Sequence, residues 1–324
     1  MPSPEWLVEH GIGETRAALV ENGEIIQARI ELDDIVRAGS VITARLANQG
    51  TTGRNAVAVS DKGDEYLLSR GAPGITEGAR LTIEVTREEI PGGEPWKRPL
   101  ARVTDKALAA MPPLAERLGG RKLVFPDARD LLSLAGWNEL IDEARTGVVR
   151  FSGGELRVTP TPAMTLIDVD GYLPPDELAV VGASEATKAI NRLDIGGPIG
   201  IDLPTSGSKA VRQLAAQAID ALLPQPFERT AVNGFGFAQV VRRRRGASLI
   251  ELAQDRGLFE ARALLRRAAF EPAGSKILVA HPAIVTHLEQ RLKWIEGLSR
   301  QLGGSIRLRP DAALPIFGGY VQAA

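Results

Sequence analysis

Short apolar runs separated by glycine-containing turns fill the first third of the chain. Between residues 5 and 31, two of these runs flank the dipeptide Asn22-Gly23, which is the strongest short-range signal for a β-hairpin. Five more runs of strand length follow between residues 35 and 105. Closely spaced short strands of this kind predict a small β-barrel of the OB-fold type, whose strand face binds oligonucleotides in some proteins.

The pattern changes after residue 105. Residues 106–146 lose the β-type alternation and are predicted to form a helical connector, interrupted at Pro112-Pro113. A predicted hairpin at residues 147–159 is followed by alternating strands and helices, and the chain ends in an amphipathic helix, residues 248–269, and a small αβ tail. We therefore expect an α+β, multi-domain chain with the N-terminal hairpin packed on the α/β region. The expected regions are 1–34 (hairpin), 35–105 (barrel), 106–146 (connector), 147–247 (α/β) and 248–324 (αβ tail).

Two strand-like runs in the α/β region stop at acidic residues. The run 165–171 contains Asp168 and Asp170, and the run 199–204 contains Asp202. A predicted helix separates the two runs, and a strand–helix–strand crossover makes its strands parallel. Parallel strands end at the same edge of a sheet, where open α/β sheets bind their ligands. The sequence therefore predicts that Asp168 and Asp202 lie side by side and form a place for a metal ion.

Two groups of basic residues follow the second acidic run. Lys209 and Arg212 begin a predicted helix directly after Asp202, and a helix N-terminus attracts phosphate. Four arginines, residues 242–245, end another predicted strand. We expect them near Asp202 as phosphate contacts, although such a run is more commonly a solvated surface or an anchor for neighbouring acids.

The composition restricts the available chemistry. The formal net charge is −1 over 324 residues, so nucleic-acid binding would need a local basic patch. The absence of cysteine excludes disulfides, thiolate zinc sites and cysteine nucleophiles, and fits a reducing cytoplasm. Two of the three histidines, His281 and His287, are six residues apart, which does not suit a metal site on one helix face. No leader pattern and no apolar run of about 18 residues occurs, so we expect a cytoplasmic protein without membrane association.

Four short motifs follow one another in the second half of the chain: Ser152-Gly153-Gly154, Leu166 to Asp170, Arg192 to Gly197 with Ile199 to Asp202, and Phe235-Gly236 followed by Arg242 and Arg244. In this order they resemble the ribonuclease E/G family of bacterial endoribonucleases, and the resemblance is strongest over about residues 150–245. The resemblance implies Mg²⁺-dependent hydrolysis of single-stranded RNA that leaves 5′-phosphate ends, with Asp168 and Asp202 as catalytic metal ligands. In the barrel, Lys97 resembles a basic RNA contact of the family, and Tyr66 falls near an aromatic residue that stacks on RNA. The second stacking position falls near Ala58.

The sequence departs from the family pattern in three ways. Asp170 stands where family members have asparagine, and this third carboxylate would bind a second ion, repel phosphate or simply form a turn. The two cysteines that share a zinc between subunits are absent, so we expect no zinc, and any homo-oligomer needs another route. The Arg-Thr pair that senses a 5′-monophosphate is not recognisable.

The expected cofactor is Mg²⁺, with Mn²⁺ as an alternative, and the expected partner is single-stranded RNA. A second reading is a non-catalytic RNA-binding protein that retains the family fold. A third is a phosphatase or nucleotide hydrolase that uses Asp168 and Asp202 on small phosphates. Cleavage in the presence and absence of EDTA distinguishes the first reading from the second, and activity on mononucleotides identifies the third.

Overall fold

A computed structural model describes residues 3–50, 55–92, 97–127 and 129–324. The chain forms two compact units, each made from separated segments. Unit 1 consists of Met1–Asp34, Leu114–Asp142 and Leu252–Ala324, and unit 2 of Ile35–Pro113 and Glu143–Glu251. The N-terminal hairpin thus belongs to the same unit as the C-terminal tail, and the barrel to the same unit as the α/β region. None of the helices in the described parts of the chain combines the length and apolar character of a membrane span.

The N-terminal hairpin of unit 1 is present as predicted. Asn22 and Gly23 have φ of 52° and 86°, and positive values at both central residues match the twist of the flanking strands. A third strand precedes the hairpin, and a fourth from residues 121–123 pairs in parallel with it. The strands are β1 (Glu5–His10), β2 (Glu14–Glu21), β3 (Glu24–Leu32) and β9 (Arg121–Leu123), in the order β3-β2-β1-β9.

The C-terminal part of unit 1 is a small αβ structure, as predicted. Leucine, isoleucine and alanine side chains of its helices and central strand form one buried core. The predicted helix from residue 248 to 269 is divided, because Asp255 accepts a hydrogen bond from the Leu258 N–H (3.3 Å) and starts a new helix there. Helix α6 (Leu249–Leu252) spans the division of the chain between the two units. The elements beyond it are α7 (Arg256–Ala269), β16 (Lys276–Ala280), α8 (Pro282–Glu289), α9 (Leu292–Leu302), β17 (Ile306–Pro310) and β18 (Tyr320–Ala323), with sheet order β17-β16-β18.

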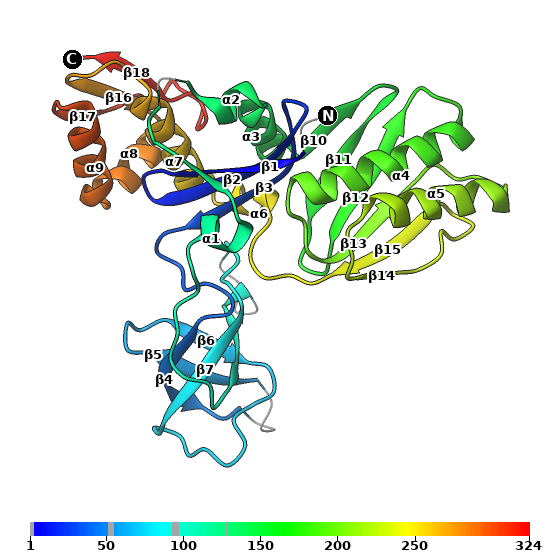
Figure 1. The fold of residues 1–324 in the computed structure, drawn as a ribbon, viewed down its shortest axis with the longest axis horizontal. Helices are drawn as coiled ribbons and strands as arrows, with labels where there is room; N and C mark the ends of the chain where they lie inside the picture. Colours follow the sequence, from blue (N-terminus) through cyan, green and yellow to red (C-terminus); the bar gives the residue numbers. More distant parts are fainter. Residues whose placement is uncertain (1–2, 51–54, 93–96, 128) are drawn as a thin grey trace. The chain divides into compact units, whose positions relative to one another are not determined.

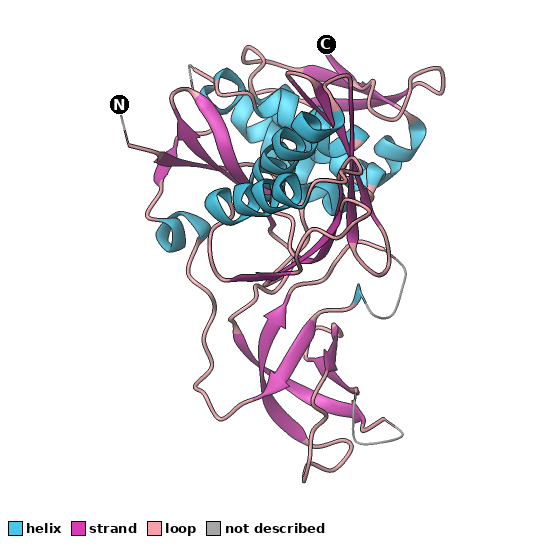
Figure 2. Cartoon of the chain, turned by 90° about the vertical axis from the view of Figure 1, so that its right-hand side faces the viewer, coloured by secondary structure: helices cyan, strands magenta, loops and turns pink. Residues whose placement is uncertain are grey.

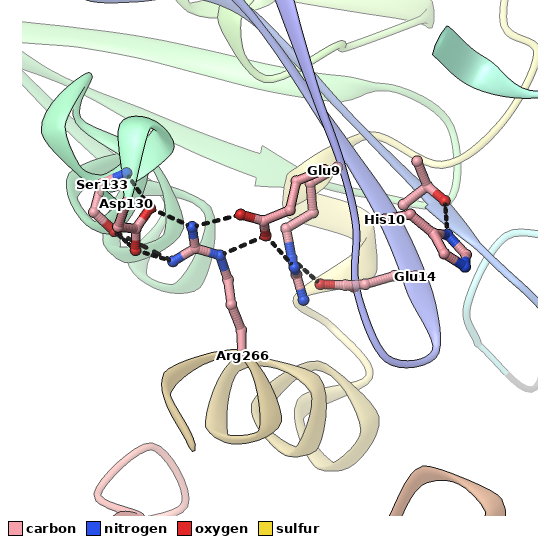
Figure 3. Close-up of polar contacts among 8 residues, drawn as sticks. Glu9, His10, Glu14, Asp130, Ser133 and Arg266 are labelled. Atoms are coloured by element: carbon pink, nitrogen blue, oxygen red, sulfur yellow. Dashed lines mark hydrogen bonds and ion pairs between the residues drawn. The ribbon is translucent and has the colours of Figure 1, made fainter. Parts of the chain in front are cut away.

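A buried ion-pair cluster, formed by Glu9, Glu14, Arg16, Arg266 and the half-buried Asp130, lies inside unit 1 (Figure 3). Arg266 donates to Glu9 Oε1 (2.9 Å) and to Asp130 Oδ1 (2.6 Å), so its guanidinium lies between two carboxylates. Arg16 donates to Glu14 (2.6 Å) and also pairs with Glu9. Every carboxylate of the cluster therefore has an arginine partner.

The segment predicted as a helical connector differs from the expectation. Residues 106–110, predicted to be helical, are not helical, because Ala109 exchanges two backbone hydrogen bonds with Val41 (2.8 and 3.1 Å). This bridge holds the segment in an extended form beside a barrel strand. Helices occur only later in the segment, as α1 (Leu114–Leu118), α2 (Leu131–Leu134) and α3 (Trp137–Thr146).

The predicted five-stranded barrel is confirmed in unit 2. Its strands close in the order β4-β5-β6-β8-β7, with β6 and β8 parallel. Figure 2 shows these strands curving around a shared interior, which is filled by small and branched apolar side chains together with one tyrosine. The strands are β4 (Val41–Asn48), β5 (Ala56–Ser60), β6 (Glu65–Leu68), β7 (Arg80–Arg87) and β8 (Leu100–Val103).

The α/β part of unit 2 is a six-stranded sheet with the predicted parallel pair at its centre. Strands β12 (Thr165–Gly171) and β13 (Gly197–Asp202) are parallel and are joined by helix α4 (Pro175–Arg192). Helices α4 and α5 (Lys209–Leu222) lie against the same face of the sheet (Figure 1). The other strands are β10 (Val148–Phe151), β11 (Gly154–Pro160), β14 (Phe227–Arg229) and β15 (Phe237–Arg242), in the order β10-β11-β12-β13-β15-β14.

Candidate active site

The alternation of strand β12 separates its apolar residues from its acidic residues. Ile167 and Val169 are buried on the face that the helices cover, whereas Asp168 and Asp170 are exposed. Successive side chains of a strand point to opposite faces. Both aspartates therefore project from the face opposite helices α4 and α5, which we call the open face.

Asp168 and Asp202 are direct neighbours across the parallel pair. The register aligns Ile167 with Ile201 and Asp168 with Asp202. Adjacent strands lie about 4.8 Å apart, so the two carboxylates leave the same face at neighbouring positions. The juxtaposition predicted from the strand–helix–strand pattern is therefore present, at the edge where β13 ends.

Negative charge is concentrated at this edge. Partial desolvation of the carboxyl group, followed by the nearby charges of Asp170 and Asp202, raises the pKa of Asp168 above its ordinary value. Arg157, which lies opposite Asp168 on β11, acts in the reverse direction, but its guanidinium is also hydrogen-bonded to Glu155 (2.7 Å). The carboxylate is thus held next to like charges, which is an arrangement that a bound cation stabilises.

A pocket of about 430 Å³ opens beside the two aspartates. Its walls come from the first turn of α4, the loop after β13 and the turn before β15. It is lined by Asp168, Val169, Asp170, Gly171, Leu173, Pro175, Leu178, Asp202, Leu203, Pro204, Thr205 and Phe235. The pocket therefore combines carboxylates with apolar walls, and it is large enough for part of a nucleotide.

The pair suits a hard cation that needs few protein ligands. Within the described ranges, no three histidine, aspartate or glutamate side chains come together in a group that holds a metal ion, so Asp170 does not complete a three-carboxylate site. Mg²⁺ commonly uses one or two carboxylates and keeps several waters. Asp168 and Asp202 fit that requirement, whereas nothing in the grouping favours a second ion at Asp170.

The two basic residues at the start of α5 have different environments. Lys209 is exposed at the first position of the helix, which follows β13 through the loop 203–208 and so begins at the edge that carries Asp202. Arg212 donates from Nη1 to the Ser206 carbonyl (2.7 Å) and braces that loop. Lys209 is therefore available to a phosphate at the edge, while Arg212 already has a partner within the chain.

The arginine run does not lie near Asp202. Strand β15 is antiparallel to β13, so Phe237 pairs with Asp202 whereas Arg242 pairs with Gly197. Five residues separate these positions along β13, or about 17 Å at the usual rise of a strand. The expected proximity is wrong because the sequence does not reveal the direction of β15.

Two side chains of this run, those of Arg242 and Arg244, have partners within the chain. Arg242 donates from Nη1 to the carbonyls of Ile190 (3.3 Å) and Ile195 (3.1 Å), at the end of α4 and in the turn beyond it. Arg244 forms an ion pair with Glu251. These contacts hold the chain around the start of β13, and they do not bring the two guanidinium groups to the open face.

The barrel residues carried over from the family resemblance also differ from expectation. Tyr66 is only 1% exposed and faces the barrel interior, where burial raises its pKa to about 12. Ala58, its partner across the strands, is likewise buried. Neither position presents a surface for base stacking, so the prediction for Tyr66 is wrong. Lys97 is partly buried, and its backbone carbonyl accepts a hydrogen bond from Ile90 (3.0 Å).

Two residues near the aspartates were not identified from the sequence. Arg157 becomes a neighbour of Asp168 through the pairing of β11 with β12, and alignment of the predicted hairpin 147–159 against the acidic strand would have indicated it. Phe235 lines the pocket and is 81% exposed. The sequence feature that could have indicated Phe235 is an aromatic residue between two glycines, Gly234-Phe235-Gly236.

Comparison with known proteins adds no identification. No protein-family model matches the chain, and no significant match was found among curated proteins.

Proposed function

We propose that the chain is a cytoplasmic, Mg²⁺-dependent endoribonuclease of a shortened ribonuclease E/G type, which hydrolyses single-stranded RNA and leaves 5′-phosphate ends. One observation carries the proposal. Asp168 and Asp202 are register neighbours at the carboxyl edge of the central parallel pair, on the open face and beside a pocket. The family resemblance of the surrounding motifs supports RNA as the substrate.

Asp168 and Asp202 are the residues that would hold Mg²⁺, and the bound ion supplies the charge that polarises a phosphodiester and lowers the pKa of an attacking water. Attack of a water on phosphorus would form the new P–O bond and break the bond to the 3′ oxygen, which leaves as a hydroxyl with a proton from that water, so that a 5′-phosphate end results. Lys209 is assigned to the phosphate, because it is exposed at the helix start that follows Asp202. Arg157 adds a second positive charge opposite Asp168.

The loop after β13 keeps this arrangement in place. Arg212 holds the Ser206 carbonyl (2.7 Å), and Ser208 caps α5 by accepting from the Val211 N–H (3.3 Å). Both contacts fix the loop directly behind Asp202. We therefore assign Arg212 to positioning of the loop and not to direct binding of RNA.

The test is cleavage of a short, end-labelled single-stranded RNA with and without Mg²⁺. We expect Asp168→Asn and Asp202→Asn each to abolish cleavage while leaving RNA affinity within about threefold of wild type, because a metal ligand is lost but the binding surface remains. Asp176→Asn, which removes a carboxylate in the first turn of α4 that does not line the pocket, is the matched control and should cut normally.

Three outcomes contradict the proposal. Normal cleavage by both aspartate variants would show that Asp168 and Asp202 do not form the catalytic site. Binding without cleavage in either Mg²⁺ or EDTA identifies a non-catalytic RNA-binding protein. Hydrolysis of mononucleotides that an excess of RNA does not inhibit identifies a small-phosphate hydrolase.

A further inference from the structure

Phe235 is an apolar side chain presented to solvent at the rim of the pocket. It is 81% exposed and lines the pocket together with Asp168 and Asp202. An aromatic ring of this size normally adds substantial stability when it is buried. Its exposure next to charged groups therefore calls for a reason other than packing.

The turn that carries Phe235 is firmly held. Asn233 accepts through its side-chain oxygen from the N–H groups of Phe235 (2.9 Å) and Phe237 (3.1 Å). The Gly236 N–H donates to the Asn233 carbonyl (3.1 Å). These bonds define the conformation of the turn on both sides of the ring, so the backbone of Phe235 is not a mobile loop tip.

The same turn is fixed to the loop that follows Asp202. The Leu203 N–H donates to the Gly236 carbonyl (3.2 Å), and the Thr205 hydroxyl donates to the Phe235 carbonyl (3.2 Å). Gly236 has φ of +90°, and a Cβ there would lie 2.1 Å from the Leu203 carbonyl oxygen. Only glycine permits this close approach, and as a result the backbone of Phe235 has a set position relative to Asp202.

We propose that Phe235 is a substrate-binding residue that stacks on the base of a nucleotide next to the phosphate held at Asp168 and Asp202. Aromatic rings bind bases of single strands through their faces, largely independently of sequence. The barrel does not offer this contact at Tyr66 or Ala58, because both are buried. The inference rests on the proposed function for its substrate class, single-stranded RNA.

The first test measures binding without cleavage. A fluorescently labelled ten-nucleotide single-stranded RNA is titrated with the full chain in EDTA. We expect Phe235→Ala to raise Kd by about 5- to 150-fold, the range for one stacked base, and Phe235→Trp to stay within about threefold of wild type. Tyr172→Ala is the matched control, since Tyr172 is 83% exposed at the end of β12 but does not line the pocket; it should change Kd by less than about twofold.

The second test locates the contact. Abasic nucleotides are placed one at a time along the same RNA, and each oligonucleotide is titrated with wild type and Phe235→Ala. We expect one abasic position at which the two proteins bind equally, because the base that stacks on the ring is missing there. An equal loss in Phe235→Ala at all positions, or no loss at any, overturns the inference. Absence of RNA binding by the wild-type chain overturns it as well.

Failure of the inference is distinguishable from failure of the proposed function. If the wild type binds RNA through Phe235 but does not cut it in Mg²⁺, the nuclease assignment fails and the stacking contact stands. If the wild type cuts RNA and Phe235→Ala has unchanged Kd and KM, the stacking contact fails and the nuclease assignment stands. A stacking role further predicts that Phe235→Ala raises KM much more than it lowers kcat.

Discussion

Carboxylates have opposite electrostatic surroundings in the two units. In the buried ion-pair cluster of unit 1, Glu9 and Asp130 both accept hydrogen bonds from Arg266. On the open face of unit 2, Asp168 and Asp202 stand next to each other at the end of a strand pair. Burial alone raises the pKa of Asp130, but bonds from Arg266 and Ser133 outweigh it and lower the pKa, whereas the pKa of Asp168 is raised.

The carboxylates of the cluster stabilise the fold through arginine partners, whereas Asp168 stands next to like charges. A carboxylate with lowered pKa stabilises the folded state when it is ionised, and one with raised pKa destabilises it. The raised pKa of Asp168 reflects desolvation and two neighbouring carboxylates, and a cation at the proposed metal site would offset both.

The largest expected effect comes from breaking the buried cluster. Arg266→Ala removes a partner from the buried Glu9 and from the half-buried Asp130, and we expect the free energy of unfolding to fall by about 3–5 kcal/mol. Arg256→Ala, at an exposed position of the same helix, is the control and should change it by a few tenths of a kcal/mol. Urea denaturation followed by tryptophan fluorescence measures both. Equal effects of the two variants would contradict the claim that the buried ion-pair cluster stabilises the fold.

A smaller effect appears in the pH dependence of stability. Because the pKa of Asp130 is lower in the folded state, its stabilisation is fully present above the unfolded pKa and is lost as the pH falls through the folded pKa. The unfolded value is about 3.9. We therefore expect wild type to lose stability on acidification below about pH 4, and Asp130→Asn, less stable at pH 7, to show a flatter profile. Parallel profiles from pH 7 to pH 3 would contradict the assignment.

The smallest effect concerns the open face and tests the role of Asp170. Its charge is one of the causes of the raised pKa of Asp168, so Asp170→Asn should lower that pKa by a fraction of a unit. A carboxyl-carbon NMR titration of the metal-free protein measures the shift. Asp176→Asn removes a charge that is not among those causes, so it should leave the pKa of Asp168 unchanged.

Local patterns predicted the elements and the central acidic pair. Glycine turns indicated the hairpin and the barrel, and the order of strand, helix and strand was sufficient to place Asp168 beside Asp202. These features follow from neighbouring residues or from a crossover with one allowed geometry. The sequence was therefore a good guide where the chain offers few alternatives.

Features that depend on strand direction or on distant partners were not predictable in this way. The antiparallel direction of β15 moved the arginine run to the far edge of the sheet. The alternation of β6 turned Tyr66 inward, and a shift of one residue would have turned it out. The partnership of Glu9 with Arg266 joins positions 257 residues apart, with no local signal at either end.

That separation affects the order in which the two units are completed during translation. Both segments of unit 2 precede residue 252, whereas unit 1 needs its last segment, Leu252–Ala324, as well as its first. At about 5–20 residues per second, Glu9 leaves the ribosome roughly 10–50 s before Arg266 is made. The strand that carries Glu9 therefore remains without Arg266 until residue 266 has been translated, and unit 1 is completed after unit 2.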